Sequence, residues 1–443
     1  MTWSFCFFAW RNRVAEFSKG TKISLKNGDK VSIVYKLGEG GQGIVYRVKY
    51  DNDEYALKWY FKNSSTNAQR EIIEKLIARG VPSNQFLWPL MLAEENESFG
   101  YLMRLRPPEY KNVVDLMKRR TEPSFNSLIV ACFNLAEGFK KLHSWGLCYC
   151  DVSFGNMFFH PEDGRILICD NDNVIVNKTK PPILGTAKFM APEVVRGEED
   201  PSTATDLYSM GILLFYMLMI HHPLEGKVEA SIKALDVPAM NKLYGWEPVF
   251  IWDPENKCNR PVKGLHDNAI IFWDVYPKYI KNMFIQSFVD GIGSPKKRVV
   301  EKEWQDAFEK LASSIFECPS CKSEIFFDEE KVNSGSGHIC WQCQENIHIP
   351  PRLKLNDLLI PLYVGKNIYR HNIYNDFDMN TICGVVIQNP RDPNILGIKN
   401  LTKSNWIYIK SDGSQSFVEP NKSAPISRNA KIEFENYIAE IIV

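Results

Sequence analysis

The sequence has no excess of charge of either sign. Lysine plus arginine and aspartate plus glutamate each number 53, so the formal net charge at neutral pH is zero. A chain without a net charge has no long-range field to steer it toward nucleic acid or an anionic membrane. We therefore expect neither a nucleic-acid partner nor a membrane partner.

Long apolar runs are also missing. Residues 210–220 form the longest run after the apolar start, and they are too few to cross a bilayer. Residues 1–10 lack a basic leader and are too short for a signal peptide, so we expect them to pack on the neighbouring lobe or to be disordered. Neither internal repeats nor low-complexity tracts occur. The 443 residues, 44% of them hydrophobic, predict two to four domains with a substantial core.

The cysteines do not suggest a disulfide framework. There are eleven, an odd number for a chain of this length, and this pattern argues against a secreted, disulfide-stapled protein. Some fall in predicted strands and helices, where we interpret them as small buried hydrophobic side chains: Cys132, Cys148, Cys150 and Cys169. These features favour a reducing, cytoplasmic compartment.

A glycine-rich stretch is followed by a lysine in an apolar segment. Residues 37–43 read LGEGGQG, and Lys58 ends the segment YALK. The glycines lie between two strand-like runs, residues 31–37 and 44–50, and not between a strand and a helix as in dinucleotide-binding folds. Glycine lets backbone N–H groups approach phosphate oxygens, because no Cβ intervenes. The stretch is compatible with a phosphate-covering hairpin or with an ordinary glycine hairpin.

Three further blocks follow in order. Residues 149–156 read YCDVSFGN, residues 166–172 read ILICDND, and residues 185–193 read GTAKFMAPE. A helical periodicity over residues 128–143 precedes the first block. A tight hairpin is predicted at residues 163–164, which read Asp-Gly, between the first block and the second.

Taken together, the four blocks resemble the protein kinase signature. The resemblance covers about residues 25–315 and is to eukaryotic-like serine/threonine kinases of the bacterial type. It implies an α+β bilobal kinase fold and ATP-dependent phosphorylation of a protein substrate, with ATP and Mg²⁺ as cofactors. Phosphoryl transfer depends on positioning and on charge neutralisation more than on covalent chemistry.

The resemblance implies a role for each matching residue. Asp151 would accept the proton of the attacking hydroxyl, with Thr186 supporting it, and Asn156 and Asp170 would hold magnesium. Lys58 would hold the α- and β-phosphates. The positions that match the family's nucleotide-binding residues are Leu37, Gly38, Gly40, Gly43, Val45, Ala56, Lys58, Met103 and Phe158.

In this family the lysine pairs with a glutamate on a helix. Glu71 and Glu74 both qualify. The positions three, four and seven residues after Glu74 are apolar (Ile77, Ala78 and Val81). The partner should share the buried face of its helix, and this favours Glu74. The alternative is that both glutamates lie on the surface.

Three positions depart from the family pattern. Cys150 replaces the arginine that grips an activation-loop phosphate, so we expect activity that is constitutive or set by a partner. Ser153 replaces a lysine near the γ-phosphate, an arrangement that also resembles RIO-type kinases. Residues 171–172, Asn-Asp, replace Phe-Gly after the metal-binding aspartate, so we expect this segment to change conformation less. These departures leave a pseudokinase scaffold open as an alternative.

Glu193 and Arg298 could form the buried ion pair that ties the third block to the large lobe. The alternative places Arg298 in a solvated run with Lys296 and Lys297. The apolar run at residues 210–220 would then be the buried central helix of that lobe.

Two cysteine pairs follow the kinase-like region. Cys318, Cys321, Cys340 and Cys343 have the C-x2-C, 18-residue, C-x2-C spacing of a zinc site. Four thiolates fill a tetrahedral site and leave no position for water, so we expect structural Zn²⁺ in a zinc ribbon over residues 316–350, with a Gly/Ser turn at 334–337. His338 is an alternative ligand.

Residues 352–443 show short apolar runs between turn signals, which predicts an all-β sandwich. They faintly resemble a forkhead-associated domain, a fold that binds phosphothreonine, and Arg370 and His371 are suggestive. A docking or autoinhibitory sandwich is the alternative, and a phosphopeptide-binding adaptor is a further candidate function. Residues 1–24 would form an N-terminal extension. The layout resembles kinases encoded beside metal-dependent protein phosphatases and von Willebrand factor A proteins, which this association suggests as partners.

Overall fold

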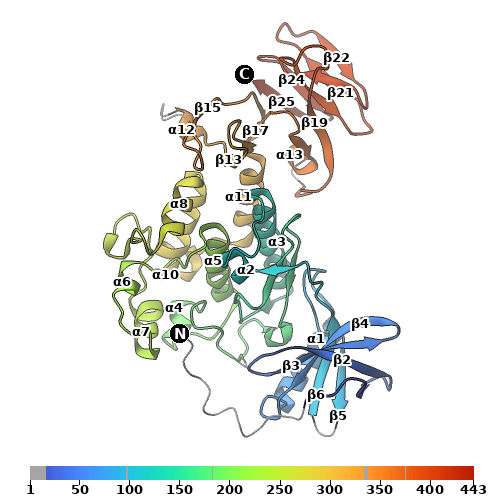
Figure 1. Ribbon diagram of the computed structural model, residues 1–443, viewed down its shortest axis with the longest axis vertical. Helices are drawn as coiled ribbons and strands as arrows, with labels where there is room; N and C mark the ends of the chain where they lie inside the picture. The colour runs from blue at the N-terminus through green and yellow to red at the C-terminus, as the bar shows by residue number, and fades with distance from the viewer. Residues whose placement is uncertain (1–15, 96–97, 182, 334–337, 375) are drawn as a thin grey trace.

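The computed structural model describes residues 16–95, 98–181, 183–333, 338–374 and 376–443. The predicted packing of residues 1–10 and the predicted turn at 334–337 lie outside these ranges. Figure 1 shows a small β-rich lobe at one end, a helical lobe in the middle and a β-rich part at the other end. Among the helices in the described ranges, none combines the length and the apolar character needed to span a membrane.

The first lobe is a closed barrel with one helix. Its strands pair in the order β1-β2-β3-β4-β6-β5. The elements are β1 (Lys22–Leu25), β2 (Lys30–Glu39), β3 (Gly43–Tyr50), β4 (Asp53–Tyr60), α1 (Asn67–Arg79), β5 (Met91–Glu95) and β6 (Ser98–Arg104). Alternating side chains such as Val31, Val48 and Leu57 fill the barrel core. The predicted hairpin over residues 31–50 is confirmed by the β2–β3 pairing.

The second lobe is mostly helical. Its main helices are α2 (Val113–Met117), α3 (Phe125–Ser144), α4 (Pro192–Val195), α5 (Thr203–Met219), α6 (Lys227–Ala230), α7 (Val237–Asn241), α8 (Asp267–Val275), α9 (Lys278–Ile285), α10 (Gly291–Gly293) and α11 (Glu301–Ser313). Helix α5 is buried almost throughout, which confirms the expectation for the apolar run. It ends where Ile220 adopts a left-handed conformation, with φ of 51°.

Short strands on this lobe carry the loops of the site. They are β7 (Lys111–Asn112), β8 (Leu147–Cys148), β9 (Met157–Phe159), β10 (Ile166–Ile168) and β11 (Ile175–Val176). Strands β9 and β10 pair antiparallel across the predicted Asp-Gly turn. Gly164 has φ of +70°, and a Cβ there would lie 2.4 Å from the Ser127 carbonyl oxygen, so only glycine fits.

The C-terminal part begins with two small hairpins. They contain β12 (Ile315–Glu317), β13 (Glu324–Phe326), β14 (His338–Ile339) and β15 (Asn346–Ile347), with α12 (Glu329–Asn333) between them. The predicted border at residue 315 falls within β12, whereas the border near 351 falls between β15 and the next strand. The division of the chain into domains stays a prediction.

The last ninety or so residues form two facing sheets. A six-stranded sheet has the order β17-β16-β25-β24-β21-β22, and a four-stranded sheet has the order β18-β19-β20-β23. The strands are β16 (Arg352–Leu355), β17 (Leu358–Pro361), β18 (Asn367–Tyr369), β19 (Ile382–Gln388), β20 (Leu396–Asn400), β21 (Trp406–Ile409), β22 (Gln415–Val418), β23 (Ser423–Pro425), β24 (Lys431–Phe434) and β25 (Tyr437–Ile442). One short helix, α13 (Arg370–Tyr374), interrupts the all-β pattern. Side chains from both sheets, including Ile398, Trp406 and Ile441, share one core.

The C-terminal part packs on the helical lobe, away from the barrel (Figure 1). The Asn372 amide donates to Ser313 Oγ at the end of α11, at 2.8 Å. Within the C-terminal part, buried Lys366 donates to the Ile315 carbonyl of β12 at 3.0 Å. Aromatic contacts join Phe125 to Trp341. The cleft between barrel and helices is therefore left uncovered by the C-terminal sheets.

Candidate functional site

A cavity of about 580 Å³ lies between the barrel and the helical lobe, under the β2–β3 hairpin. All nine residues that the sequence predicts for nucleotide binding line it: Leu37, Gly38, Gly40, Gly43, Val45, Ala56, Lys58, Met103 and Phe158. Asp151 and Asp170 line its other wall. At Gly43 a Cβ would meet the Trp59 carbonyl oxygen at 2.1 Å, so the hairpin requires glycine there.

The inner end of the cavity is apolar. Ala56 on β4 and Met103 on β6 are buried and face each other in the strand pairing. The Arg106 guanidinium lies 4.0 Å from the centre of the Phe158 ring, which is a cation–π distance. A flat, apolar slot with polar groups at its rim suits a planar base.

The loop after β8 holds three of the predicted residues together. The Thr186 hydroxyl donates to Asp151 Oδ1 at 2.8 Å. The Asn156 amide donates to the Asp151 carbonyl at 2.9 Å and to its Oδ2 at 3.3 Å. Asp151 therefore has its carboxylate oriented from two sides while remaining at the cavity wall.

Asp206 at the start of α5 fixes the backbone of this loop. Its carboxylate accepts the N–H groups of Tyr149 at 2.5 Å and Cys150 at 3.0 Å. Cys150 has φ of 70°, an unusual conformation for a residue with a side chain. The buried carboxylate compensates for this strain by satisfying two backbone donors.

Lys58 is buried and bound by several acceptors. Its Nζ lies 2.8 Å from Asp172 and 3.1 Å from Asp170, and it donates to Gln42 Oε1 at 3.2 Å. Burial alone would lower the pKa of Lys58, but the Asp172 and Asp170 carboxylates outweigh it and raise that pKa. Lys58 is therefore held as a cation at the cavity floor.

The prediction that Glu74 pairs with Lys58 is wrong in this structure. Glu74 forms a surface ion pair with Lys26 at 2.7 Å, and Glu71 lies on the surface near Lys75. The reason is the end of the helix: α1 stops at Arg79, so Val81 does not belong to its apolar face and is 43% exposed.

The face of α1 that does point inward carries Gln69, Ile73 and Leu76. Gln69 Nε2 donates to the Asp172 carbonyl at 2.8 Å. Counting from Gln69 at steps of four and seven would have identified this face. The sequence prediction considered acidic residues, Glu71 and Glu74, and Gln69 is neutral.

The segment after Asp170 is tied down by polar contacts. Asn171 is fully buried and its amide donates to the Leu87 carbonyl at 3.0 Å and the Ile168 carbonyl at 2.9 Å. Asp170 itself has φ of 48°, and its side chain is 40% exposed toward the cavity. A metal ion in the cavity could reach that carboxylate, whereas Asn156 is 8% exposed and its amide donates to Asp151.

The Glu193–Arg298 ion pair is confirmed. The guanidinium donates to both carboxylate oxygens at 2.8 Å, and the side chains are 8% and 1% exposed. The alternative that placed Arg298 in a solvated surface run is wrong. The pair fastens α4 to the segment that follows α10.

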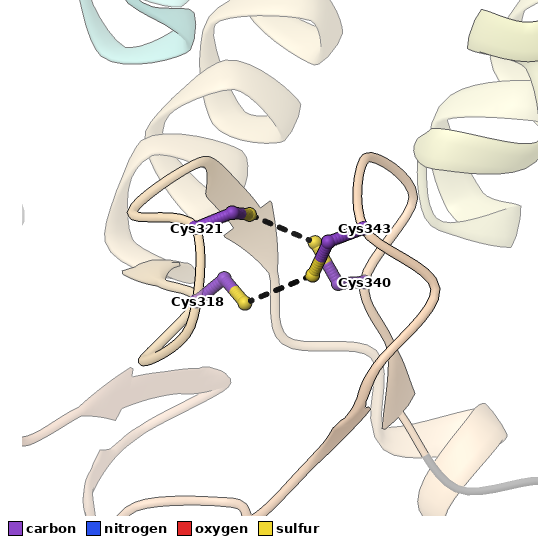
Figure 2. Close-up of side chains that lie close together, drawn as sticks. All are labelled: Cys318, Cys321, Cys340 and Cys343. Carbon is purple, nitrogen blue, oxygen red and sulfur yellow. Dashed lines mark hydrogen bonds between the residues drawn. The ribbon is translucent and has the colours of Figure 1, made fainter.

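The two cysteine pairs come together in the hairpins after α11. Cys318 Sγ lies 3.7 Å from Cys343 Sγ, and Cys321 Sγ lies 3.6 Å from Cys340 Sγ, as Figure 2 shows. All four sulfurs lie within 4.8 Å of one another. A tetrahedral zinc–thiolate site requires sulfurs about 3.8 Å apart, whereas a disulfide requires about 2 Å. The cluster therefore fits Zn²⁺ and not disulfides.

The turns around this cluster repeat one geometry. The N–H of Lys322 donates to the Cys318 carbonyl, and that of Gln344 donates to the Cys340 carbonyl, both at 2.9 Å. The two donor residues have φ of 63° and 62°. His338 is outside the cluster, because its Nε2 accepts the Asp328 N–H at 3.3 Å.

Arg370 and His371 do not converge on an open site. Arg370 is paired with Asp376, and His371 is 3% exposed. Burial lowers the pKa of His371 to about 4. Both side chains are engaged in contacts within the chain.

Comparisons with known proteins match the part of the chain that forms the cleft. The family model for the protein kinase domain matches residues 31–285. Protein kinase C delta type from Rattus norvegicus is 27% identical over 208 residues, which cover 44% of this chain and 30% of that protein. The same enzyme type from Homo sapiens is 26% identical over 208 residues, again 44% and 30%.

A third relative is the cell cycle serine/threonine-protein kinase CDC5/MSD2 from Saccharomyces cerevisiae. It is 25% identical over 205 residues, which cover 43% of this chain and 28% of that protein. The chain thus spans less than a third of the length of each of these three relatives.

Proposed function

Because this chain belongs to the protein kinase family, we propose that it transfers the γ-phosphate of ATP to serine and threonine hydroxyls of protein substrates, its own chain among them. One observation carries the proposal. Lys58, Asp151 and Asp170 line a single cavity under a glycine-rich hairpin, and Asn156 is hydrogen-bonded to Asp151 at its wall.

The roles follow from chemistry. Asp170 and Asn156 would hold Mg²⁺, which neutralises charge on the phosphates when it is bound. Lys58 would place a fixed positive charge against the α- and β-phosphates. The cavity's apolar end would take the adenine ring, between Ala56 and Phe158.

Asp151 would accept the substrate hydroxyl's proton. The Thr186 hydroxyl donates to Oδ1, which leaves Oδ2 the freer oxygen to face the incoming hydroxyl. From the residues that the structure describes, Oδ2 accepts the long 3.3 Å bond from the Asn156 amide. A general base of this kind must lie within hydrogen-bond reach of the proton that it takes.

The Cys318, Cys321, Cys340 and Cys343 cluster would hold structural Zn²⁺. Four sulfur donors leave no open coordination position, so the metal would stabilise the hairpins and take no part in phosphoryl transfer. The ten cysteines in the described part of the chain form no disulfides, which supports a reducing, cytoplasmic location.

The remaining assignments rest on domain order. A bacterial origin, a forkhead-associated-like C-terminal sandwich, and partnership with a metal-dependent phosphatase and a von Willebrand factor A protein stay predictions. The Arg370–Asp376 ion pair gives no support to phosphothreonine binding at that position.

The test is transfer of labelled γ-phosphate from Mg-ATP to a protein substrate and to the chain itself. Wild type should incorporate phosphate on serine and threonine, mapped by mass spectrometry, whereas Asp151→Asn and Asp170→Ala should lose about 10²-fold to 10⁴-fold of the rate. Equal incorporation by all three proteins would contradict the proposal. Nucleotide binding without transfer in the wild type would identify a pseudokinase scaffold instead.

A further inference from the structure

Within the described ranges, helix α1 offers no carboxylate to the lysine at the floor of the cleft, because Glu74 pairs with Lys26 and Glu71 lies near Lys75. Gln69 occupies the inward face of α1 at this point, and its amide carries no charge. A buried ammonium group without a counter-charge is strongly unfavourable, so another acid must compensate. The structure supplies that acid from the metal-binding segment.

Asp172 is the carboxylate closest to Lys58. Its side chain is completely buried, and one carboxylate oxygen lies 2.8 Å from Nζ. The Tyr60 hydroxyl donates to the same carboxylate, so the acid is oriented by two donors from β4. Lys58 and Tyr60 lie two residues apart on one strand and therefore on the same face.

Asp170 is less suited to this task. It is also near Lys58, at 3.1 Å, but its side chain is 40% exposed and faces the cavity. A carboxylate that turns toward a metal ion gives up part of its contact with the lysine. Asp172 has no such exposure, so its contact persists when Asp170 is engaged.

The backbone around Asp172 is anchored on both sides. Asn171 donates to the Leu87 and Ile168 carbonyls, and Gln69 donates to the Asp172 carbonyl. Helix α1 thus contributes a neutral amide to the backbone of this segment and not a carboxylate to the lysine.

We propose that Asp172 is the positioning residue for Lys58, in the place that a helix glutamate holds in the family, and that Gln69 couples α1 to this unit. The inference rests on the proposed kinase function. It makes the Lys58–Asp172 ion pair part of the metal-binding segment, so this ion pair forms whenever residues 170–173 are in place. A swing of α1 that moves Gln69 would change the Lys58–Asp172 pair indirectly, through the Asp172 carbonyl at 2.8 Å and the Tyr60 hydroxyl at 3.3 Å, to both of which the Gln69 amide donates.

The test compares two matched carboxylate-to-amide changes, Asp172→Asn and Glu74→Gln. The first should raise KM for ATP or lower kcat so that kcat/KM falls on the order of 10-fold to 100-fold, because Lys58 is misplaced. The second should stay within about twofold, because Glu74 is in a surface ion pair. A large loss with Glu74→Gln and none with Asp172→Asn would overturn the inference.

A double-mutant cycle separates positioning from stability. Mg-ATP affinity is measured by calorimetry for Asp172→Asn alone, for Lys58→Met alone and for both together. If Asp172 acts through Lys58, its change weakens binding about tenfold in the wild-type background and less than about twofold beside Lys58→Met. Equal losses in both backgrounds would contradict the inference. Should Asp172→Asn fail to fold, Asp172→Glu enters the same cycle, because it keeps the charge and displaces it by one methylene.

The same experiments distinguish this inference from the proposed function. A wild type that transfers no phosphate defeats the kinase assignment itself. A wild-type rate in Asp172→Asn, with Asp151→Asn inactive, defeats only the role of Asp172.

Discussion

The cleft joins residues 114 positions apart in the sequence and the cysteine cluster joins residues 25 positions apart, and the two sites also differ in what they leave open. The cleft keeps a cavity of about 580 Å³ and an exposed Asp170 carboxylate. The cluster brings four sulfurs within 4.8 Å, and these would leave no coordination position free on the proposed Zn²⁺. The cleft can therefore bind and release a ligand, whereas the cysteine cluster can only stabilise the fold.

This difference predicts that loss of zinc from the cysteine cluster lowers stability without changing nucleotide binding in the cleft. Cys321→Ser should abolish retention of one zinc per chain and lower Tm by about 5 °C or more, because a structural metal contributes folding energy directly. KM for ATP should change less than about twofold in the molecules that stay folded, because the cluster is remote from the cleft. Zinc content, calorimetric Tm and steady-state kinetics check this. Unchanged Tm with lost transfer would reverse the assignment of the two sites.

The buried Glu193–Arg298 ion pair is a second stabilising contact, and it can be tested in the helical lobe. Arg298→Met removes one partner of a buried, bidentate pair and should lower the free energy of unfolding by about 3–5 kcal/mol. Lys26→Met, which breaks the exposed pair with Glu74, is the matched control and should cost less than about 1 kcal/mol. Urea denaturation measures both, and equal losses would show that burial does not distinguish them.

A third stabilising contact, the ion triad around His143, should depend on pH. His143 on α3 lies between Asp206 at 3.1 Å and Glu301, which are on α5 and α11. Burial opposes its charge, but the two carboxylates outweigh burial and raise the pKa of His143 to about 9.

The stabilisation should therefore be complete below the unfolded-state pKa of about 6.5 and disappear as pH rises through about 9. Its size is on the order of 3 kcal/mol. The difference in unfolding free energy between wild type and His143→Gln, measured from pH 6 to pH 10, should shrink across this window. A constant difference would exclude the ion triad as its cause.

The smallest effect on the transfer rate is expected from removing phosphate groups from the chain. Cys150 is 8% exposed and stands where the family has a phosphate-gripping arginine. Broad phosphatase treatment should leave the transfer rate within about twofold, because a thiol cannot pair with a phosphate as a guanidinium does. A large drop in activity after treatment would show that another group serves this purpose.

The sequence predicts groups whose spacing is local and leaves distant pairings open. Asp151 and Asn156 are recognisable because they lie five positions apart in one loop, and the cysteine pairs are recognisable for a similar reason. Lys58 and Asp172 are 114 residues apart, and nothing in the order of the residues joins them. Helix α1 ends at Gly80, with φ of 82°, so Val81 does not extend an apolar face from Glu74, and the buried residues are Gln69, Ile73 and Leu76.

The C-terminal sheets show the same limit. Alternating apolar residues predict strands, since side chains on one face repeat every two residues. The pairing of the first strand, β16, with the last, β25, is a tertiary contact that alternation does not specify. The short helix α13 also escapes this pattern, because its position reflects docking on α11 through Asn372.

The most direct measurement of the central claim is calorimetric titration of the full chain with ATP, with and without Mg²⁺. Lys58, Asp151 and Asp170 around one cavity predict binding that strengthens with Mg²⁺ and is weakened by Asp170→Ala. A chain that binds no adenine nucleotide in the presence of Mg²⁺ would contradict the account.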